Sequence, residues 1–166
     1  MKFVAIDMAE ALFFSSTDKV QRYKELLPQL QALIELEANS VANMANFCAA
    51  LKETFGWFWI GFYLVENDEL VLGPFQGPVA CTRIQKGKGV CGTAWASGKT
   101  IVVEDVEKFP GHIACSALSK SEIVLPLIKN DQTIGVLDID STELASFDAT
   151  DQNELEKICK WFASRL

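Results

Sequence analysis

The sequence lacks any hydrophobic run long enough to cross a membrane, and it lacks any run of basic residues. A membrane-spanning helix needs about 20 predominantly apolar residues, and no segment of the chain approaches that length. The apolar N-terminus resembles a signal peptide, but Asp7 and Glu10 interrupt it and no cleavage pattern follows. Nucleic-acid binding depends on neutralising phosphates with lysine and arginine, whereas this chain has a net charge of −7. We therefore expect a cytoplasmic protein that binds neither a membrane nor nucleic acid.

The sequence also lacks the paired ligands of a structural zinc site. Such ligands usually lie two to four residues apart, but the chain has one histidine and no CxxC motif. Its cysteines are Cys48, Cys81, Cys91, Cys115 and Cys159. In a reducing compartment permanent disulfides are rare, so such cysteines are apolar filler, metal ligands or redox catalysts. The wide spacing favours redox chemistry over zinc, and we expect no metal.

The cysteines fall into two groups by their place in the sequence. Cys48 and Cys159 lie on the apolar stripes of predicted helices, where a free cysteine acts as a small hydrophobic residue. Cys81, Cys91 and Cys115 lie in loop-rich sequence, where reactive groups concentrate. Cys91 lies at the start of a predicted helix, where the backbone N–H groups and the helix dipole favour a thiolate.

His112 lies three residues before Cys115 and suggests a Cys–His nucleophile. A nucleophilic hydrolase also needs an orienting third group and oxyanion donors, and no known arrangement of that kind has this spacing. We therefore expect His112 to form a local hydrogen bond or to tune a thiolate, and not to act as a catalytic base.

Two hydrophobic periods divide the chain. Up to Gly56 the apolar residues recur near the helical period, which predicts a helix over 18–34 capped by Asp18, kinked or split at Pro28, and a second helix from Ser40. From Trp57 the period is two. The further elements expected are strands over 57–64, 70–75, 100–103, 123–128 and 133–139, a short helix after residues 87–92, and a last helix over about 150–166.

This order of elements predicts an α+β fold, with a central and mainly antiparallel sheet. We expect the N- and C-terminal helices on one face of the sheet and a loop-covered pocket on the other. One domain would span residues 1–166, with a helical lead-in over about 1–56, a pocket-bearing core over about 57–148 and the C-terminal helix over about 150–166.

Three carboxylates are predicted to meet at one end of this sheet. Alternation along the strand places Asp138 and Asp140 on the same face. If a turn at 130–131 joins the last two strands as a hairpin, Glu122 pairs close to both. Clustered acids raise one another's pKa, so one of them could hold a proton near neutral pH. The alternative is that all three are solvated charges at strand ends.

The two faces of the aromatic strand are predicted to differ. Alternation places Trp57, Trp59, Gly61 and Tyr63 on one face and Phe58, Ile60, Phe62 and Leu64 on the other. The second set has the character of core packed against helices. The first set is either core or the wall of a pocket, in which Gly61 would leave room for a ligand.

The segments GKGVCGTA, GHIAC, SEIVLPL and GVLDIDS, in this order and spacing, resemble the free methionine-(R)-sulfoxide reductases, a family of stand-alone GAF domains. The resemblance is strong from about Trp57 to Phe147 and looser over the N-terminal helices. It implies that Cys115 is the attacking cysteine, Cys81 the main resolving cysteine, and Cys91 a third cysteine of the pocket that can share the resolving role.

The resemblance further implies how the substrate is held. Glu122, Asp138 and Asp140 would bind and polarise it, and Trp59 and Tyr63 would lie near its methyl group. Backbone N–H groups around Val90 and Cys91, at a helix start, would suit its carboxylate. We expect no cofactor beyond thioredoxin or another external dithiol, and an exposed strand edge and the N-terminal segment would allow a homodimer.

Two other functions compete with a reductase. GAF domains often sense small molecules without reacting, but a sensor normally accompanies an output domain and does not require three loop cysteines. A thiol-based redox sensor would use the cysteines without a methionine pocket. Peroxide oxidation of the thiols without turnover of any sulfoxide would favour that sensor.

Overall fold

The computed structural model describes residues 11–113 and 116–166. Two helices come first, α1 (Lys19–Ile34) and α2 (Ser40–Phe55). Asp18 caps α1 by accepting a hydrogen bond from the Gln21 N–H, as the sequence predicts. The predicted split at Pro28 is wrong, because α1 continues through Pro28 as one helix. Gly56 ends α2 in the left-handed conformation, with a φ of 70°.

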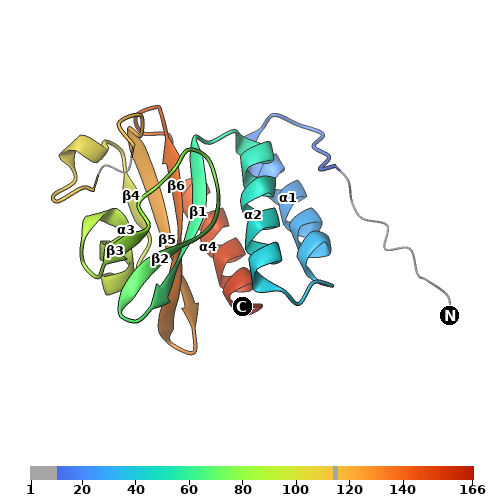
Figure 1. Cartoon of the computed structure of the whole chain (residues 1–166). Coiled ribbons are helices and arrows are strands. Elements are labelled where there is room, and N and C mark those ends of the chain that lie inside the picture. The colour runs from blue at the N-terminus through green and yellow to red at the C-terminus, as the bar shows by residue number, and fades with distance from the viewer. Residues whose placement is uncertain (1–10, 114–115) are drawn as a thin grey trace.

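A six-stranded antiparallel sheet forms the centre of the molecule (Figure 1). Its strands and the helices between them are β1 (Trp59–Glu66), β2 (Glu69–Gln76), β3 (Arg83–Gln85), α3 (Gly89–Ser97), β4 (Ile101–Val103), the short 3-10 helix η1 (Val106–Lys108), β5 (Ser121–Lys129) and β6 (Gln132–Ser141). The strand order is β3-β2-β1-β6-β5-β4, which places β1 and β6 at the centre with β2 and β5 beside them. The turns 67–68 and 130–131 have positive φ at both residues, the conformation that joins two antiparallel strands tightly.

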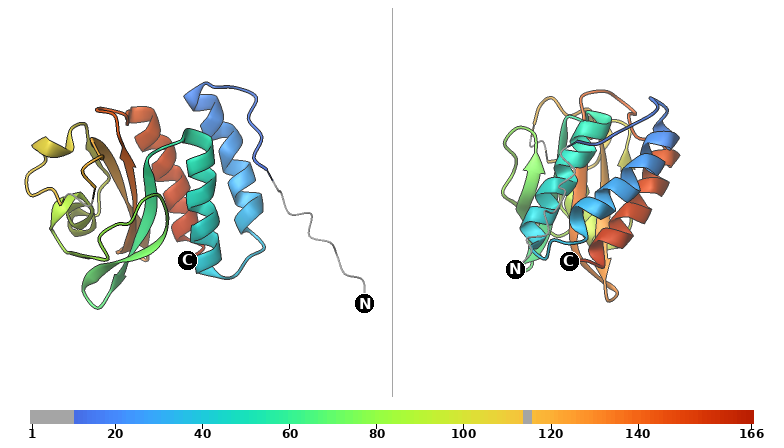
Figure 2. Two further views of the ribbon diagram at one scale, coloured as in Figure 1. Left: turned by 45° about the horizontal axis from the view of Figure 1, so that its top comes forward. Right: turned by 90° about the vertical axis from the view of Figure 1, so that its right-hand side faces the viewer.

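The helices α1, α2 and α4 (Ala149–Ala163) lie together on one face of the sheet, and α3 lies on the other (Figure 2). Two separate clusters of buried apolar residues fill these two spaces. The larger cluster packs the helices against Ile60, Phe62, Leu137 and Ile139. The α+β prediction is therefore confirmed, with the terminal helices on one face only. Among the described residues, no helix is long and apolar enough to span a membrane.

The predicted faces are wrong at Trp57 and Phe58, the first two residues of the strand that the sequence predicts over 57–64. Trp57 packs with the helix-side cluster, where its ring stacks on Phe55 at 4.4 Å, and Phe58 packs on the opposite side. The reason is that β1 begins at Trp59 and the chain bends at Phe58. The Lys52 ammonium donates hydrogen bonds to the carbonyl oxygens of both Trp57 and Phe58, so these two residues do not follow the alternation of the strand.

Candidate functional site

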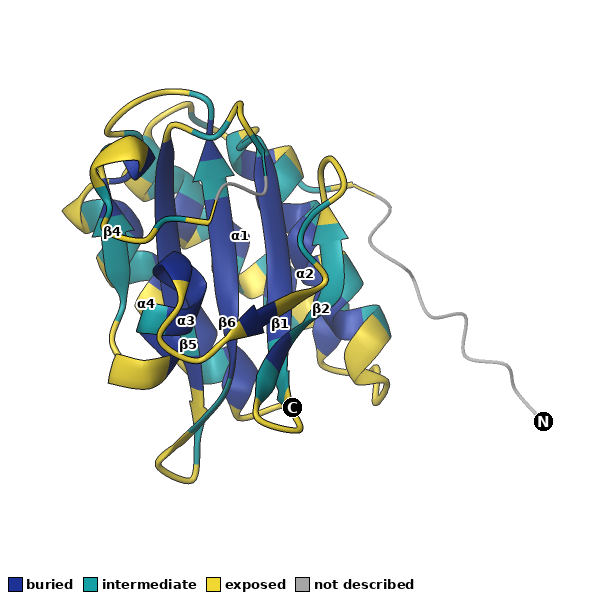
Figure 3. Cartoon of the chain, turned by 60° about the vertical axis from the view of Figure 1, so that its left-hand side comes forward, coloured by how far each residue is buried: buried dark blue, intermediate teal, exposed yellow. Residues whose placement is uncertain are grey.

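A pocket lies on the sheet face opposite the long helices, where β1, β5 and β6 meet the N-terminus of α3. Figure 3 looks onto this face, where the central strands are buried and exposed loops cross in front of them. The pocket contains about 570 Å³ of empty space, part of which is open to solvent. The structure brings together here the predicted residues Trp59, Tyr63, Val90, Cys91, Glu122, Asp138 and Asp140.

The three carboxylates meet because the β5–β6 hairpin has the predicted register. Glu122 pairs with Asp140 across the two strands, and Asp138 pairs with Val124. Glu122 and Asp138 are 5% and 7% exposed, so they are not the solvated strand-end charges of the alternative interpretation. The Oδ1 atom of Asp138 is buried and has no hydrogen-bond partner among the described residues.

Burial controls the protonation of this acid cluster. It raises the pKa of Glu122 well above its ordinary value, and the negative charges of Asp138 and Asp140 raise it further. The pKa of Asp138 is raised by burial and then by Asp140. Burial raises the pKa of Asp140 to about 6, although a hydrogen bond with Ser119 opposes the change. At neutral pH the cluster therefore holds at least one proton.

Cys91 lies at the start of α3, but its thiol is not activated there. Burial raises the pKa of Cys91 well above its usual value, and the charges of Asp138 and Glu122 raise it further. The prediction that the helix dipole favours a thiolate is therefore wrong, because burial and the nearby acids together outweigh the dipole. Cys91 Sγ lies 3.9 Å from Glu122 Oε1, and the ligand atoms of Cys91, Glu122 and Asp138 all lie within 4.8 Å of one another.

The N-terminus of α3 is open toward the pocket. Lys88 occupies the cap position, but its side chain forms no capping hydrogen bond. The first backbone N–H groups of a helix have no partner within the helix, and Gly89 and Val90 line the pocket. These N–H groups are placed to bind an anion such as a carboxylate.

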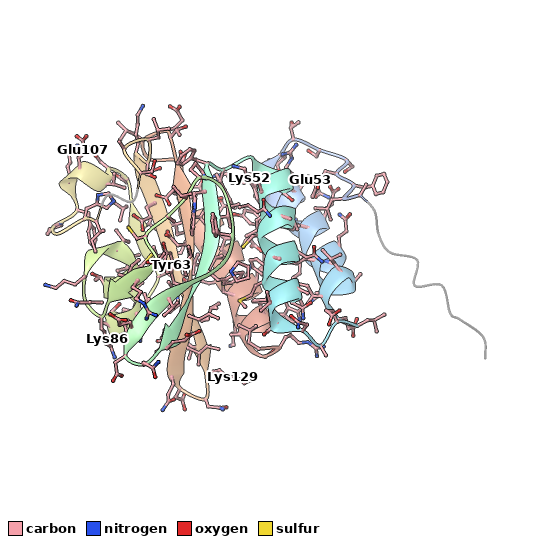
Figure 4. The ribbon with its side chains drawn as sticks, viewed as in Figure 1. Lys52, Glu53, Tyr63, Lys86, Glu107 and Lys129 are labelled. Atoms are coloured by element: carbon pink, nitrogen blue, oxygen red, sulfur yellow. The ribbon has the colours of Figure 1, made fainter. Side chains whose placement is uncertain are left out.

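Two aromatic residues of β1 form the opposite wall of the pocket. Tyr63 lies between the sheet and α3 (Figure 4), and its hydroxyl donates a hydrogen bond to the Cys81 carbonyl oxygen at 3.0 Å. Trp59 donates from Nε1 to the carbonyl oxygen of Pro78 at 3.0 Å, and its ring stacks on Phe75 at 5.4 Å. Both side chains therefore hold the loop after β2 against the sheet.

The hypothesis that Gly61 leaves room for a ligand is wrong. A Cβ atom at Gly61 would lie 2.2 Å from Cη2 of Trp59 and 2.6 Å from Cβ of Phe75. The space above Gly61 is thus occupied by the Trp59 ring. A Cβ atom at Gly77 would also approach this ring, to 2.5 Å from Cδ1. Gly61 and Gly77 together define where the Trp59 ring lies.

The cysteines separate as predicted where the structure describes them. Cys48 and Cys159 are buried in the helix-side cluster as free thiols, and Cys91 is also free. Cys81 is disulfide-bonded. The predicted nucleophile, Cys115, lies outside the described residues, and its role stays a prediction.

His112 lines the pocket, with its Nε2 3.8 Å from Glu122 Oε2. Burial lowers the pKa of His112, which favours the neutral ring. The sequence interpretation missed several lining residues, among them Phe58, Lys88 and Ser119. Phe58 was assigned to the wrong face, and the other two lie in loops, where no periodicity indicates which side chains point inward.

The chain is similar in sequence and in structure to several known proteins. The chain matches the GAF domain model over residues 39–163. A relative from Dictyostelium discoideum, named GAF domain-containing protein A, is 62% identical over 92% of this chain and 98% of its own length. The free methionine-R-sulfoxide reductase of Escherichia coli (strain K12) is 49% identical over 85% of this chain and 86% of its own. A structure of the Neisseria meningitidis free methionine-R-sulfoxide reductase in complex with its substrate has a TM-score of 0.91 and 57% identity, and covers 93% of this chain and 94% of that one.

Proposed function

The chain belongs to the free methionine-R-sulfoxide reductase family of GAF domain proteins, and from this premise we propose that it reduces free methionine-(R)-sulfoxide to methionine with its own cysteine thiols. The observation that carries the proposal is the Asp138 carboxylate, whose buried Oδ1 has no hydrogen-bond partner among the described residues. A buried polar atom without a partner is costly. Within the described chain no lysine or arginine forms an ion pair with the three acids, so the pocket favours a cationic ligand.

A free amino acid supplies both charges that the pocket requires. Its ammonium group would bind an ionised carboxylate of the acid cluster, which one of Asp138, Asp140 and Glu122 supplies. Its carboxylate would accept hydrogen bonds from the backbone N–H groups at the uncapped start of α3, near Val90 and Cys91. A methionine sulfoxide within a peptide has neither charge to place there. We therefore expect free substrate to be preferred, and equal turnover of free and peptide-bound methionine sulfoxide would contradict this part of the proposal.

The acid cluster would also supply the proton that the reduction needs. The Cys115 thiolate attacks the sulfoxide sulfur and forms an S–S bond, and a protonated carboxyl group of the acid cluster gives its proton to the sulfoxide oxygen. The S–O bond breaks as the resulting hydroxyl group moves to the Cys115 sulfur, and the S–S bond breaks with its electron pair left on the methionine sulfur, so that methionine leaves and Cys115 remains as a sulfenic acid. Sulfur is reduced in the substrate and oxidised in the enzyme, so the electrons balance.

The sulfenic acid would then react with a second cysteine. The Cys81 thiol condenses with it to form a disulfide and releases water, with Cys91 able to share this role. The bonding of Cys81 supports this assignment, because it is disulfide-bonded while Cys48, Cys91 and Cys159 are free. Thioredoxin or another dithiol reopens the disulfide by exchange. No other cofactor is required, and a cytoplasmic location and a homodimer stay predictions.

The test is turnover of free methionine-(R)-sulfoxide with DTT as reductant. We expect activity in the wild type, none in Cys115→Ser, and unchanged activity in the matched control Cys159→Ala, whose thiol lies in the helix-side cluster. An inactive wild type would overturn the reductase proposal. Binding of a small molecule without turnover would then favour a GAF sensor, and peroxide oxidation of the thiols would favour a redox sensor.

A further inference from the structure

Three potential metal ligands meet in the pocket from three different elements. Cys91 comes from α3, Glu122 from β5 and Asp138 from β6. Each offers one sulfur or oxygen atom, and these atoms all lie within 4.8 Å of one another. All three side chains are buried and line the same cavity, at 4%, 5% and 7% exposure. An ion that enters the pocket can therefore contact all three.

The spacing of these atoms suits a small divalent cation. With bonds of about 2.3 Å to sulfur and about 2.1 Å to oxygen, ligand atoms around a tetrahedral zinc ion lie about 3.5 Å apart. Cys91 Sγ and Glu122 Oε1 are already 3.9 Å apart. Small side-chain rotations would therefore complete three bonds, and the fourth position would face the pocket and hold water.

A second observation also indicates a cationic ligand at this place. Asp138 Oδ1 is buried and unpartnered among the described residues, and Asp138 is more than nine-tenths buried. His112 Nε2 lies 3.8 Å from Glu122 Oε2, but this contact is an ion pair only when the ring is protonated. The cluster thus has carboxylate oxygens to offer and little compensating charge.

The sulfur ligand selects the type of ion. Carboxylates alone suit magnesium and calcium, whereas a thiolate combined with carboxylates favours zinc or cadmium. We propose that the reduced pocket binds a thiophilic divalent cation of this class through Cys91, Glu122 and Asp138, and that the bound ion excludes the substrate. The binding stands on the geometry alone, and the exclusion rests on the proposed function.

Exclusion follows because the two ligands need the same oxygens. The substrate ammonium and the metal ion would both bind the acid cluster, and a buried carboxylate oxygen cannot serve both. A ligand that competes for the free enzyme raises the apparent KM and leaves kcat unchanged. In this structure Cys91 is a free thiol while Cys81 is disulfide-bonded, so the disulfide present leaves these three ligands in place.

Binding is tested on the full chain, reduced with a phosphine and titrated with Cd²⁺, whose bond to a thiolate gives an ultraviolet charge-transfer band. Zn²⁺ should abolish the band by competition. We expect Cys91→Ser to remove the band and Asp138→Asn to weaken affinity by at least the roughly 10–100-fold that loss of an outer-shell partner costs. Cys159→Ala, the matched control, and the double variant Cys81→Ser/Cys115→Ser should keep the band. Loss of the band in that double variant, or its retention in Cys91→Ser, would overturn the site.

A measurement on the wild type keeps the test independent of variant folding. X-ray absorption of the zinc-loaded protein should show one sulfur and several oxygen ligands, and two or three sulfur ligands would refute the site. For the exclusion, turnover is followed with the phosphine as reductant, because DTT itself binds zinc. The apparent KM should rise with Zn²⁺ while kcat stays constant. Zinc binding without inhibition would refute the exclusion, whereas an inactive metal-free protein would refute the proposed function and leave the metal site standing.

Discussion

Gly61→Ala should displace the Trp59 ring and weaken both the fold and the pocket. The added Cβ would lie 2.2 Å from Cη2 and 2.7 Å from Cζ3 of the indole, far inside van der Waals contact. On its other side it would lie 2.6 Å from the Cβ of Phe75, whose position is tied to the backbone of β2. The indole is therefore the group that must move.

The cost follows from what the indole loses. Extra volume in a packed core costs about 1–3 kcal/mol, and loss of the hydrogen bond from Trp59 Nε1 to the Pro78 carbonyl costs about 1 kcal/mol. We expect the free energy of unfolding to fall by about 2–4 kcal/mol, measured from urea unfolding. Because Trp59 lines the pocket, kcat/KM for methionine-(R)-sulfoxide should fall as well.

A double-mutant cycle separates the clash with the Trp59 ring from other effects of the Gly61→Ala substitution. Trp59→Phe removes the indole atoms that lie closest to the new methyl group, so it should relieve most of the clash in the Gly61→Ala background. We expect the double variant to be at least about 1 kcal/mol more stable than the sum of the two single variants predicts. Additive effects, or a Gly61→Ala variant as stable and active as the wild type, would refute this account of the site.

Two further predictions concern Tyr63 and Asp140. Tyr63→Phe removes the hydrogen bond to the Cys81 carbonyl, so it should lower the free energy of unfolding by about 1 kcal/mol. In a single turnover it should slow the formation of the disulfide, while the rate of methionine release stays unchanged. Equal slowing of both steps would argue against a positioning role for Tyr63. Burial raises the pKa of Asp140 from 3.8 in the unfolded chain to about 6 in the fold, so the folded state binds more protons between these values, and stability should decrease as pH rises from about 4 to about 6. At about 1.4 kcal/mol for each pKa unit, this decrease in the free energy of unfolding amounts to about 3 kcal/mol, and Asp140→Asn should abolish it. The urea midpoint of the variant should therefore depend less on pH than that of the wild type. An unchanged pH dependence would contradict the raised pKa.

The convergence of the acids could be predicted because local rules determine it. Alternation places Asp138 and Asp140 on one face, and the tight turn at 130–131 sets the register that brings Glu122 beside them. The helix bounds were equally accessible, since Asp18 and Gly56 mark their ends by capping. In each case neighbours in the sequence, or residues joined by one short turn, decide the outcome.

The errors concern individual side-chain contacts rather than the pattern of helices and strands. The faces of Trp57 and Phe58 depend on Lys52 of α2, which holds both carbonyl groups. The pKa of Cys91 depends on acids from β5 and β6, and the space above Gly61 depends on how the Trp59 ring folds back over it. Periodicity carries no information on any of these contacts.

Alternate residues of the central strand β6 are constrained by different requirements, either packing against the helices or binding a ligand. In β6, Leu137 and Ile139 pack with the helices, while Asp138 and Asp140 line the pocket. Substitutions of the helix-facing residues should therefore change mainly the stability of the fold, and substitutions of the pocket-facing residues mainly its ligand specificity. A single inserted or deleted residue in β6 would turn the acids toward the helices and the apolar residues toward the pocket. Substitutions can thus change the pocket while the fold is kept, but insertions or deletions within this strand would disrupt both.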